Sequence, residues 1–340
     1  MRQTRNTIAA AAISIIVASW GLSGIASAAD TIKQAGFKTV DLAVPFLAKE
    51  KGFFAKNGLD WEYLEISSGK LGIAALLSGD VQFVDLGLDD VVALQAMGKD
   101  PIAIYSMVNS LTMDVVVGNN TMKTLGVTPA SPLADRLKAF KGLTFGITRP
   151  GAWTQVFVQY LMGKVGLDPE KDATFVQIGG GTALVAAVKS GAIDGFMLSA
   201  PAPYILENDK SGTILIKNSA GEGPDELKNF AFESIATRKS YAENNPEIVI
   251  AFTRSLNQAY QWLIENRAEA LEALKVYFPE TDMGTLSLSV DSLIPAIMPG
   301  GTLSAEAIQN QLDVWVSFGY VESSPSSAEG VLWTNKYISK

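Results

Sequence analysis

The feature that most constrains the fold of this chain is a near-repeat of one segment. Residues 66–91 read ISSGKLGIAALLSGDVQFVDLGLDDV, and residues 178–203 read IGGGTALVAAVKSGAIDGFMLSAPAP. A shift of 112 positions places the small-residue stretch 74–79, AALLSG, on 186–191, AAVKSG. Repetition of this kind indicates two similar structural units, so the chain is predicted to fold as two related halves.

Each copy of the repeat lies in the same order of expected elements. A helical segment that ends in Gly-Leu-Asp stands before each copy, at residues 46–60 and 158–168, and a strand-like stretch follows it at residues 61–66 and 174–178. Helices that alternate with short β-branched runs are typical of α/β units with a parallel sheet and right-handed crossovers. The sequence therefore predicts two α/β units.

The chain is expected to pass between the two halves twice. Residues 113–119, MDVVVGN, read as the passage from the first half to the second, and residues 213–219, TILIKNS, read as the return strand. We therefore predict a discontinuous first lobe and a continuous second lobe, with amphipathic helices of the first lobe near the C-terminus. The expected ranges are 29–117 plus 216–340 for lobe 1, 118–215 for lobe 2, and 246–266, 268–278 and 304–321 for those helices.

The N-terminus has the pattern of an export signal. Arg2 and Arg5 give a positive start, residues 8–18 are apolar but short for a membrane span, and Ala26-Ser27-Ala28 matches a small-x-small cleavage site. We predict a signal peptide of residues 1–28, cleavage after Ala28 and a periplasmic mature protein. An uncleaved membrane anchor is the alternative.

The composition excludes several classes of chemistry. The chain has no cysteine and no histidine, so disulfides, thiolate catalysis, Cys/His zinc sites and a Ser-His-Asp triad within the chain are ruled out. The net charge is −8 and no run of Lys or Arg occurs, which argues against nucleic acid as a partner. We expect no cofactor, no metal site and no catalytic residue.

Ligands of open α/β sheets bind where the carboxyl ends of strands lead into helices, because backbone N–H groups are exposed there. Six loops fit that description, and in two lobes that face each other all six line one cleft. They are FKTVDLAVP (37–45), SSGK (67–70), GLDD (87–90), TRPGAWT (148–154), GGGT (179–182) and SAPAP (199–203).

The loop TRPGAWT offers the most varied chemistry. Gly151 permits unusual dihedrals and close backbone approach, and Thr154 is placed to cap a helix or donate its hydroxyl to a ligand. Trp153 is placed to stack on a planar ligand, and Arg149 to bind a carboxylate or sulfonate with two hydrogen bonds. A capped turn, with a solvated Arg149 and a Trp153 packed on its own domain, is the alternative.

Other candidate residues come from the remaining loops and from the segments near the crossings. Asp89, with Asp90, starts a helix and has two readings: a helix cap, or a carboxylate that receives a ligand amine. Phe37, Trp153 and Tyr204 favour a solute larger than nitrate. The further predicted ligand-binding residues are Lys38, Ser67, Ser68, Gly87, Ser110, Gly180, Ser199, Pro201 and Glu233.

The sequence resembles the periplasmic substrate-binding proteins of ABC importers for nitrate, sulfonates, taurine and thiamine-pyrimidine precursors. The motifs that carry the resemblance cover nearly the whole mature chain: AKEKGFFAKNGLDWEYLE (48–65), ALLSGDVQFVDLG (75–87), KGLTFGITRPGAWT (141–154) and AAVKSGAIDGFMLSAP (186–201). The resemblance implies a type II-like α/β clamshell of two lobes joined by two connecting strands. It also implies a small-molecule solute, anionic or aromatic, held between the lobes and delivered to a membrane permease by a monomer.

Two other function classes stay open at this point. One is an exported enzyme that acts through carboxylates, for which Asp89, Asp90 and Glu233 are the available acids. The other is a sensory binding protein that feeds a membrane receptor. The related eukaryotic pyrimidine-forming enzymes depend on a cysteine-rich motif and on histidine, and this chain contains neither residue.

Overall fold

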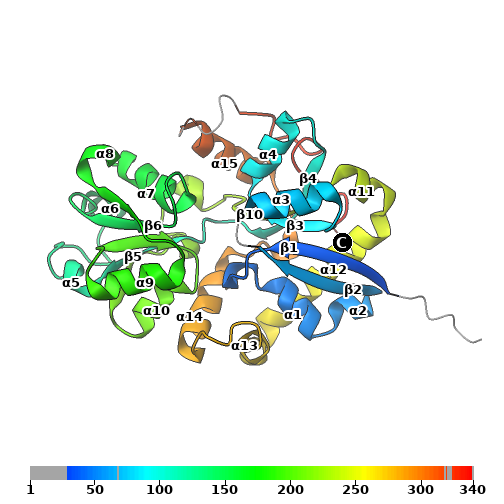
Figure 1. Ribbon diagram of the computed structural model, residues 1–340, viewed down its shortest axis with the longest axis horizontal. Helices are drawn as coiled ribbons and strands as arrows, with labels where there is room; N and C mark the ends of the chain where they lie inside the picture. The colour runs from blue at the N-terminus through cyan, green and yellow to red at the C-terminus, as the bar shows by residue number, and fades with distance from the viewer. Residues whose placement is uncertain (1–28, 67–68, 318, 320–323, 339–340) are drawn as a thin grey trace, which may run out of the picture.

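The computed structural model describes residues 29–66, 69–317, 319 and 324–338, so the predicted signal peptide lies outside the described residues. The described chain forms two α/β lobes that lie side by side (Figure 1). Each lobe is built on one five-stranded sheet. No helix within the described ranges is long and apolar enough to cross a membrane.

The two sheets have the same architecture. Lobe 1 contains β1 (Asp30–Gly36), β2 (Leu59–Glu65), β3 (Phe83–Leu86), β4 (Pro101–Val108) and β10 (Glu233–Arg238), in the order β2-β1-β3-β10-β4. Lobe 2 contains β5 (Asp114–Gly118), β6 (Thr144–Ile147), β7 (Thr174–Gln177), β8 (Gly195–Leu198) and β9 (Gly212–Ile216), in the order β7-β6-β8-β5-β9. The α/β fold expected from the sequence is confirmed.

The sheets are mixed rather than purely parallel, which corrects one expectation. In lobe 1, β10 runs antiparallel to β3 and β4, and in lobe 2, β5 runs antiparallel to β8 and β9. The physical reason is the route of the chain, since β5 and β10 are the strands that enter a sheet from the other lobe. Their neighbours β1, β2 and β3 pair in parallel, as do β6, β7 and β8.

The internal repeat coincides with the elements of the structure. A shift of 112 positions places α3 (Gly69–Ser78) on α9 (Gly181–Ser190), and β3 on β8, with the same bounds. Gly191 follows α9 in the left-handed conformation at φ 73°, which ends the helix as a glycine at this position commonly does. The repeat therefore marks the strand–helix–strand unit that both lobes share.

The remaining helices cover the sheets. Around lobe 1 lie α1 (Val44–Glu50), α2 (Phe53–Lys56), α4 (Leu88–Ala96), α11 (Lys239–Asn244), α12 (Pro246–Glu265), α13 (Arg267–Lys275), α14 (Met283–Leu293) and α15 (Ala305–Ser317). Around lobe 2 lie α5 (Asn119–Met122), α6 (Leu133–Lys138), α7 (Trp153–Gly163), α8 (Pro169–Asp172) and α10 (Ala202–Asn208). The three C-terminal helices expected from their periodicity are present as α12, α13 and α15.

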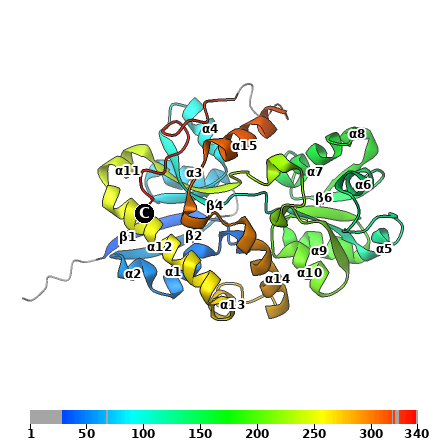
Figure 2. The same cartoon turned by 180° about the vertical axis from the view of Figure 1, so that it is seen from behind.

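Helix α14 belongs to the boundary between the lobes. It packs against α13 of lobe 1 and also against α10 of lobe 2. Figure 2 shows α14 beside both lobes, below the crossing segments. The C-terminal part of the chain therefore contacts lobe 2 as well as covering lobe 1.

The chain crosses between the lobes in two segments. The first joins β4 to β5 through residues 109–113, and the second joins β9 to β10 through residues 217–232. Since β5 and β9 both pair within the second sheet, these crossings lie slightly outside the ranges 113–119 and 213–219. The lobe ranges 29–117 plus 216–340 and 118–215 stay a prediction.

Candidate ligand-binding site

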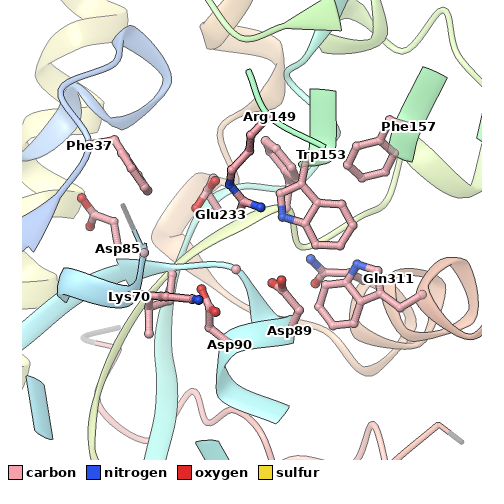
Figure 3. Close-up of a pocket in the computed structure, with 15 residues that line it drawn as sticks. Phe37, Lys70, Asp85, Asp89, Asp90, Arg149, Trp153, Phe157, Glu233 and Gln311 are labelled. Atoms are coloured by element: carbon pink, nitrogen blue, oxygen red, sulfur yellow. The ribbon is translucent and has the colours of Figure 1, made fainter. Parts of the chain in front are cut away.

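A cavity of about 440 Å³ lies between the two lobes. Its size falls within the range of roughly 300–1,000 Å³ that is usual for small-molecule sites. Residues of lobe 1 line one side, residues of lobe 2 line the other, and α15 closes one edge (Figure 3). Its lobe 1 lining includes the ends of β1 and β3, which are carboxyl ends of parallel strands as the fold predicts.

The lobe 1 side of the cavity is acidic. Asp85 lies on β3, Asp89 and Asp90 lie in the first turn of α4, and Glu233 is the first residue of β10. Carboxylates at a helix start are favoured by the positive end of the helix dipole, which accounts for the two acids of α4. Because β3 and β10 are neighbours in the sheet, their ends bring the other two acids to the same place.

These acids resist ionisation. Burial raises the pKa of Asp85 to about 7, and burial together with the Asp90 charge raises the pKa of Asp89 to about 8. Burial raises the pKa of Asp90 to about 6. Burial, reinforced by Asp41, Asp85, Asp89 and Asp90, also holds the pKa of Glu233 well above its ordinary value. Each of these carboxyl groups therefore ionises at a higher pH than an ordinary aspartate or glutamate.

Asp85 is held in place by a chain of hydrogen bonds. The Gln34 amide Nε2 donates to Asp85 Oδ1 over 2.6 Å, and Trp61 Nε1 donates to Gln34 Oε1 over 2.9 Å. Gly36 leaves the space that the carboxylate fills, since a Cβ at that position would lie 1.7 Å from Asp85 Oδ2. The backbone and the side chains of β1 and β2 therefore fix this acid.

The lobe 2 side is aromatic with one guanidinium group. Trp153 begins α7, and Phe157 follows one turn later on the same helix, with their ring centroids 5.3 Å apart. Arg149 precedes α7, is exposed to solvent and points into the cavity (Figure 3). The strand β6 and the turn after it deliver these three side chains to the cleft.

Helix α15 adds two buried polar groups to the cavity edge. Trp315 stacks on Trp153, with centroids 6.0 Å apart and planes 25° apart. Gln311 is only 2% exposed, and among the described residues its Oε1 has no hydrogen-bond donor. The Trp315 indole N–H likewise lacks an acceptor within the described part of the chain. Polar atoms that are buried without a partner are costly, so the cavity holds unused hydrogen-bonding capacity.

Comparison with known proteins gives the family. The model of a family described as the NMT1-like family matches residues 29–276. The chain belongs to the NMT1-like family. That match includes both sheets and every cavity residue named above except those of α15.

Individual relatives of this NMT1-like chain are named as binding proteins. YtlA of Bacillus subtilis strain 168, named as a candidate binding protein, is 25% identical over 72% of this chain and 70% of its own length. The nitrate/nitrite binding protein NrtA of Synechocystis is 25% identical over 72% of this chain. The match spans only 56% of NrtA.

Solved structures of such binding proteins have the same fold. The NrtA structure from Synechocystis PCC 6803 superposes with a TM-score of 0.66 at 20% identity, over 87% of this chain and 83% of NrtA. The aliphatic sulphonate binding protein SsuA from Escherichia coli superposes with a TM-score of 0.68 at 16% identity, over 91% of this chain and 99% of SsuA. The two-lobed clamshell expected from the sequence is thereby confirmed.

Several residues predicted for the site line the cavity of this NMT1-like protein. They come from both lobes, and the acids and rings among them face the same space (Figure 3). These residues are Phe37, Gly87, Asp89, Arg149, Trp153 and Glu233.

Two residues of the TRPGAWT loop have structural roles. Gly151 adopts φ +72°, as predicted, and no protein atom lies within 4 Å of the Cβ it lacks, so close approach of a ligand to this backbone stays a prediction. Thr154 is buried and its Oγ1 accepts the backbone N–H of Thr148 over 3.1 Å. The hydroxyl therefore closes the loop and does not cap α7, whose N-cap is Ala152.

The other predicted residues that the structure describes are not among the residues that line the cavity. Lys38 and Gly180 are exposed, Ser110 is buried in the first crossing segment, and Ser67 and Ser68 lie outside the described residues. Ser199 Oγ lies 3.2 Å from Thr112 Oγ1, and Pro201 follows a cis peptide bond at the start of α10. Tyr204, suggested as a ligand-stacking ring, is buried and donates its hydroxyl to Asp114 over 2.6 Å.

Some lining residues were not singled out from the sequence. Asp85 follows two apolar residues, Phe83 and Val84, in a buried strand, and a carboxylate in such a run is the signal that could have identified it. Gln311 and Trp315 lie in an amphipathic helix whose aromatic residues read as core. The remaining lining residues in this group are Gly69, Lys70, Leu86, Phe157 and Phe232, whereas Asp90, which the sequence offered together with Asp89, also lines the cavity.

Proposed function

We propose that this chain is an exported solute-binding protein that captures a small organic molecule between its lobes and delivers it to the permease of an ABC importer. The observation that carries the proposal is the single space to which both lobes contribute side chains. A solute that contacts both lobes stabilises the closed arrangement by its differential affinity, as in other hinge-closing binding proteins.

The relatives support this class of function. NrtA is named for nitrate and nitrite, and SsuA for aliphatic sulphonates, so the fold serves solute capture in more than one relative. By analogy with these periplasmic proteins we infer that the mature chain is periplasmic. We also expect it to act as a monomer. The residues that we expect to touch the solute are Phe37, Gly87, Asp89, Arg149, Trp153 and Glu233.

The capture step is tested by solution scattering on the mature protein, residues 29–340. A bound solute should lower the radius of gyration, because the lobes close about the crossing segments. A solute that binds at saturating concentration without changing the scattering profile would contradict closure. Mass spectrometry of the released solute should recover it unchanged, whereas an enzyme would return a product.

Export is tested separately. N-terminal sequencing of the periplasmic protein should begin at Ala29, because the charged start, the apolar stretch and Ala26-Ser27-Ala28 match a cleaved signal peptide. Recovery of full-length protein in the membrane fraction alone would support the uncleaved anchor instead.

A further inference from the structure

We propose that the solute of this cavity is an organic cation: a planar or aromatic body that carries an ammonium or amidinium group. This inference rests on the proposed function and specifies its substrate class. It differs from the anions for which NrtA and SsuA are named.

The balance of charged side chains favours a cation. Four carboxyl groups line the cavity, from Asp85, Asp89, Asp90 and Glu233, against the basic groups of Lys70 and Arg149. Both basic residues are exposed to water, whereas Asp85 and Asp89 are buried, at 1% and 8% exposure. Water screens the exposed cations more strongly than the buried acids, so the interior of the cavity has acidic character.

The acids have no cation of their own. Within the described ranges, none of the ion pairs involves Asp85, Asp89, Asp90 or Glu233, although twelve pairs occur elsewhere. Buried acids are ordinarily paired, because an unpaired charge is expensive to desolvate. A positively charged solute would supply the missing partner.

An independent observation points in the same direction. The Gln311 side chain points into the cavity (Figure 3), and its buried Oε1 has no donor among the described residues. Together with the carboxylates it makes the cavity rich in hydrogen-bond acceptors, while the Trp315 indole N–H is a buried donor at the same edge. Ammonium and amidinium groups donate hydrogen bonds and accept none, so they complement a lining that is rich in acceptors.

A bare metal ion fits the cavity less well than an organic cation. No group of three or more acids in the described part of the chain has an arrangement that could hold a metal ion. The cavity is also far larger than an ion, and its walls include Phe37, Trp153, Phe157, Phe232 and Trp315. Aromatic faces attract organic cations and bury flat rings, which explains why acids and rings occur together.

The test uses three probes of similar shape and different charge: benzamidine, benzamide and benzoate. Calorimetric titration of the mature protein at pH 8 should give a dissociation constant for benzamidine at least tenfold below that for benzamide, with benzoate weaker still. Equal or tighter binding of benzamide or benzoate would overturn the cation proposal and leave the receptor function intact, because a solute would still have bound.

A variant separates charge recognition from general damage. Asp89→Asn should weaken benzamidine at least tenfold while changing benzamide less than threefold. Asp60→Asn removes an exposed carboxylate near the start of β2 that does not line the cavity. This control should change neither the benzamidine affinity nor the benzamide affinity. Equal weakening of both probes by Asp89→Asn would contradict charge recognition.

If none of the three probes binds, a small-molecule cell extract separated by charge decides between the two proposals. The cationic fraction should raise the melting temperature of the protein more than the anionic fraction does. The reverse order would overturn the cation proposal. No shift with any fraction would instead contradict the proposed receptor function.

Discussion

Asp85 Oδ1 accepts a hydrogen bond of 2.6 Å from Gln34 Nε2, and this contact joins the neighbouring strands β1 and β3 of lobe 1 beside the cavity. Gln34 is itself oriented by the indole N–H of Trp61 on the next strand. The acid therefore keeps one position without an ion pair, which is the arrangement expected of a preorganised site. Its position also depends on Gly36, because a side chain there would occupy the space of the carboxylate.

Gly36→Ala should displace the Asp85 carboxylate, because the new Cβ would lie 1.7 Å from Oδ2 in the present arrangement. We expect the free energy of unfolding to fall by about 1–3 kcal/mol, as for other overpacked interiors, and benzamidine binding to weaken. Gly163→Ala is the control, since nothing lies within 4 Å of that position on α7. Denaturant unfolding of both variants measures the difference in unfolding free energy. Equal losses in Gly36→Ala and Gly163→Ala would contradict the idea that Gly36 makes room for the Asp85 carboxylate.

Asp89→Asn should stabilise the empty protein at pH 8. The pKa of Asp89 is raised from 3.8 in the unfolded reference to about 8 in the folded state, so wild-type stability falls as the pH rises from about 4 to 8. The amide does not titrate, and we expect a gain of about 1–3 kcal/mol at pH 8 and little difference near pH 4. The charged and titratable groups that line the same cavity as this acid are Lys70, Asp85, Asp90, Arg149 and Glu233, and the Asp90 charge acts on it directly.

Urea unfolding at pH 4, 6 and 8 tests this dependence, with Asp60→Asn as the matched change of an exposed carboxylate. A stability difference between wild type and Asp89→Asn that stays constant across the three pH values would show that the carboxyl group is not desolvated.

Benzamidine binding should become tighter as the pH rises from 5 to 8. Amidinium keeps its charge throughout this range, while the carboxylates of Asp85 and Asp89, with pKa values of about 7 and 8, ionise within it. Binding of the cation should therefore release protons, which calorimetry in two buffers of different ionisation enthalpy measures. Benzamide should show neither effect, and a pH-independent benzamidine affinity would contradict the role of these acids.

Trp153→Ala should weaken an aromatic solute by about 1–3 kcal/mol, because the half-buried ring lines the cavity. We expect the loss of stability to stay below the roughly 3–5 kcal/mol typical of a core tryptophan. Trp262→Ala on α12, whose ring contacts Lys51, serves as the control for removal of an indole elsewhere. Unchanged affinity with a core-like loss of stability would mean that Trp153 only packs against Trp315.

Tyr204→Phe should weaken the hydrogen bonds that hold Asp114, the first residue of β5, against α10 and the second crossing segment. The Tyr204 hydroxyl donates to Asp114, whose carboxylate also accepts from the Ser219 N–H over 3.0 Å. Loss of one hydrogen bond to a buried acid should cost about 1–3 kcal/mol of unfolding free energy. The control is Tyr277→Phe, whose hydroxyl donates over 3.3 Å to the exposed Glu50. Similar losses of unfolding free energy in the two variants would contradict a larger contribution from the buried Tyr204–Asp114 hydrogen bond.

Local features of the sequence predicted much of this molecule. The repeat, the glycines that end helices and the periodicity of residues 246–266 each depend on short-range backbone physics, and they gave the two units and α12. Asp89 and Trp153 were predicted because they stand where a strand hands over to a helix, which is where ligands of such sheets bind. For these residues, position along the chain determines position in space.

The residues that were missed depend on contacts that sequence spacing does not encode. Gln311 and Trp315 reach the cavity from α15, more than 150 residues after Trp153, and only packing of that helix beside α4 brings them there. The reversed direction of β10 follows from the return of the chain from lobe 2, not from the composition of the strand. Thr154 has the sequence of a helix start, yet its hydroxyl forms a bond within its own loop.

The two sheets share one strand order, but the halves face the cavity with unlike chemistry. Among the described residues, the lining acids Asp85, Asp89, Asp90 and Glu233 come from lobe 1, while Arg149 and Trp153 come from lobe 2. An ancestral duplication would explain the common plan, and later divergence the difference between the two facing surfaces. Substitutions that alter the charge of the preferred solute would then fall in lobe 1, and those that alter the stacking surface would fall in lobe 2. Either property could therefore change in evolution without the other.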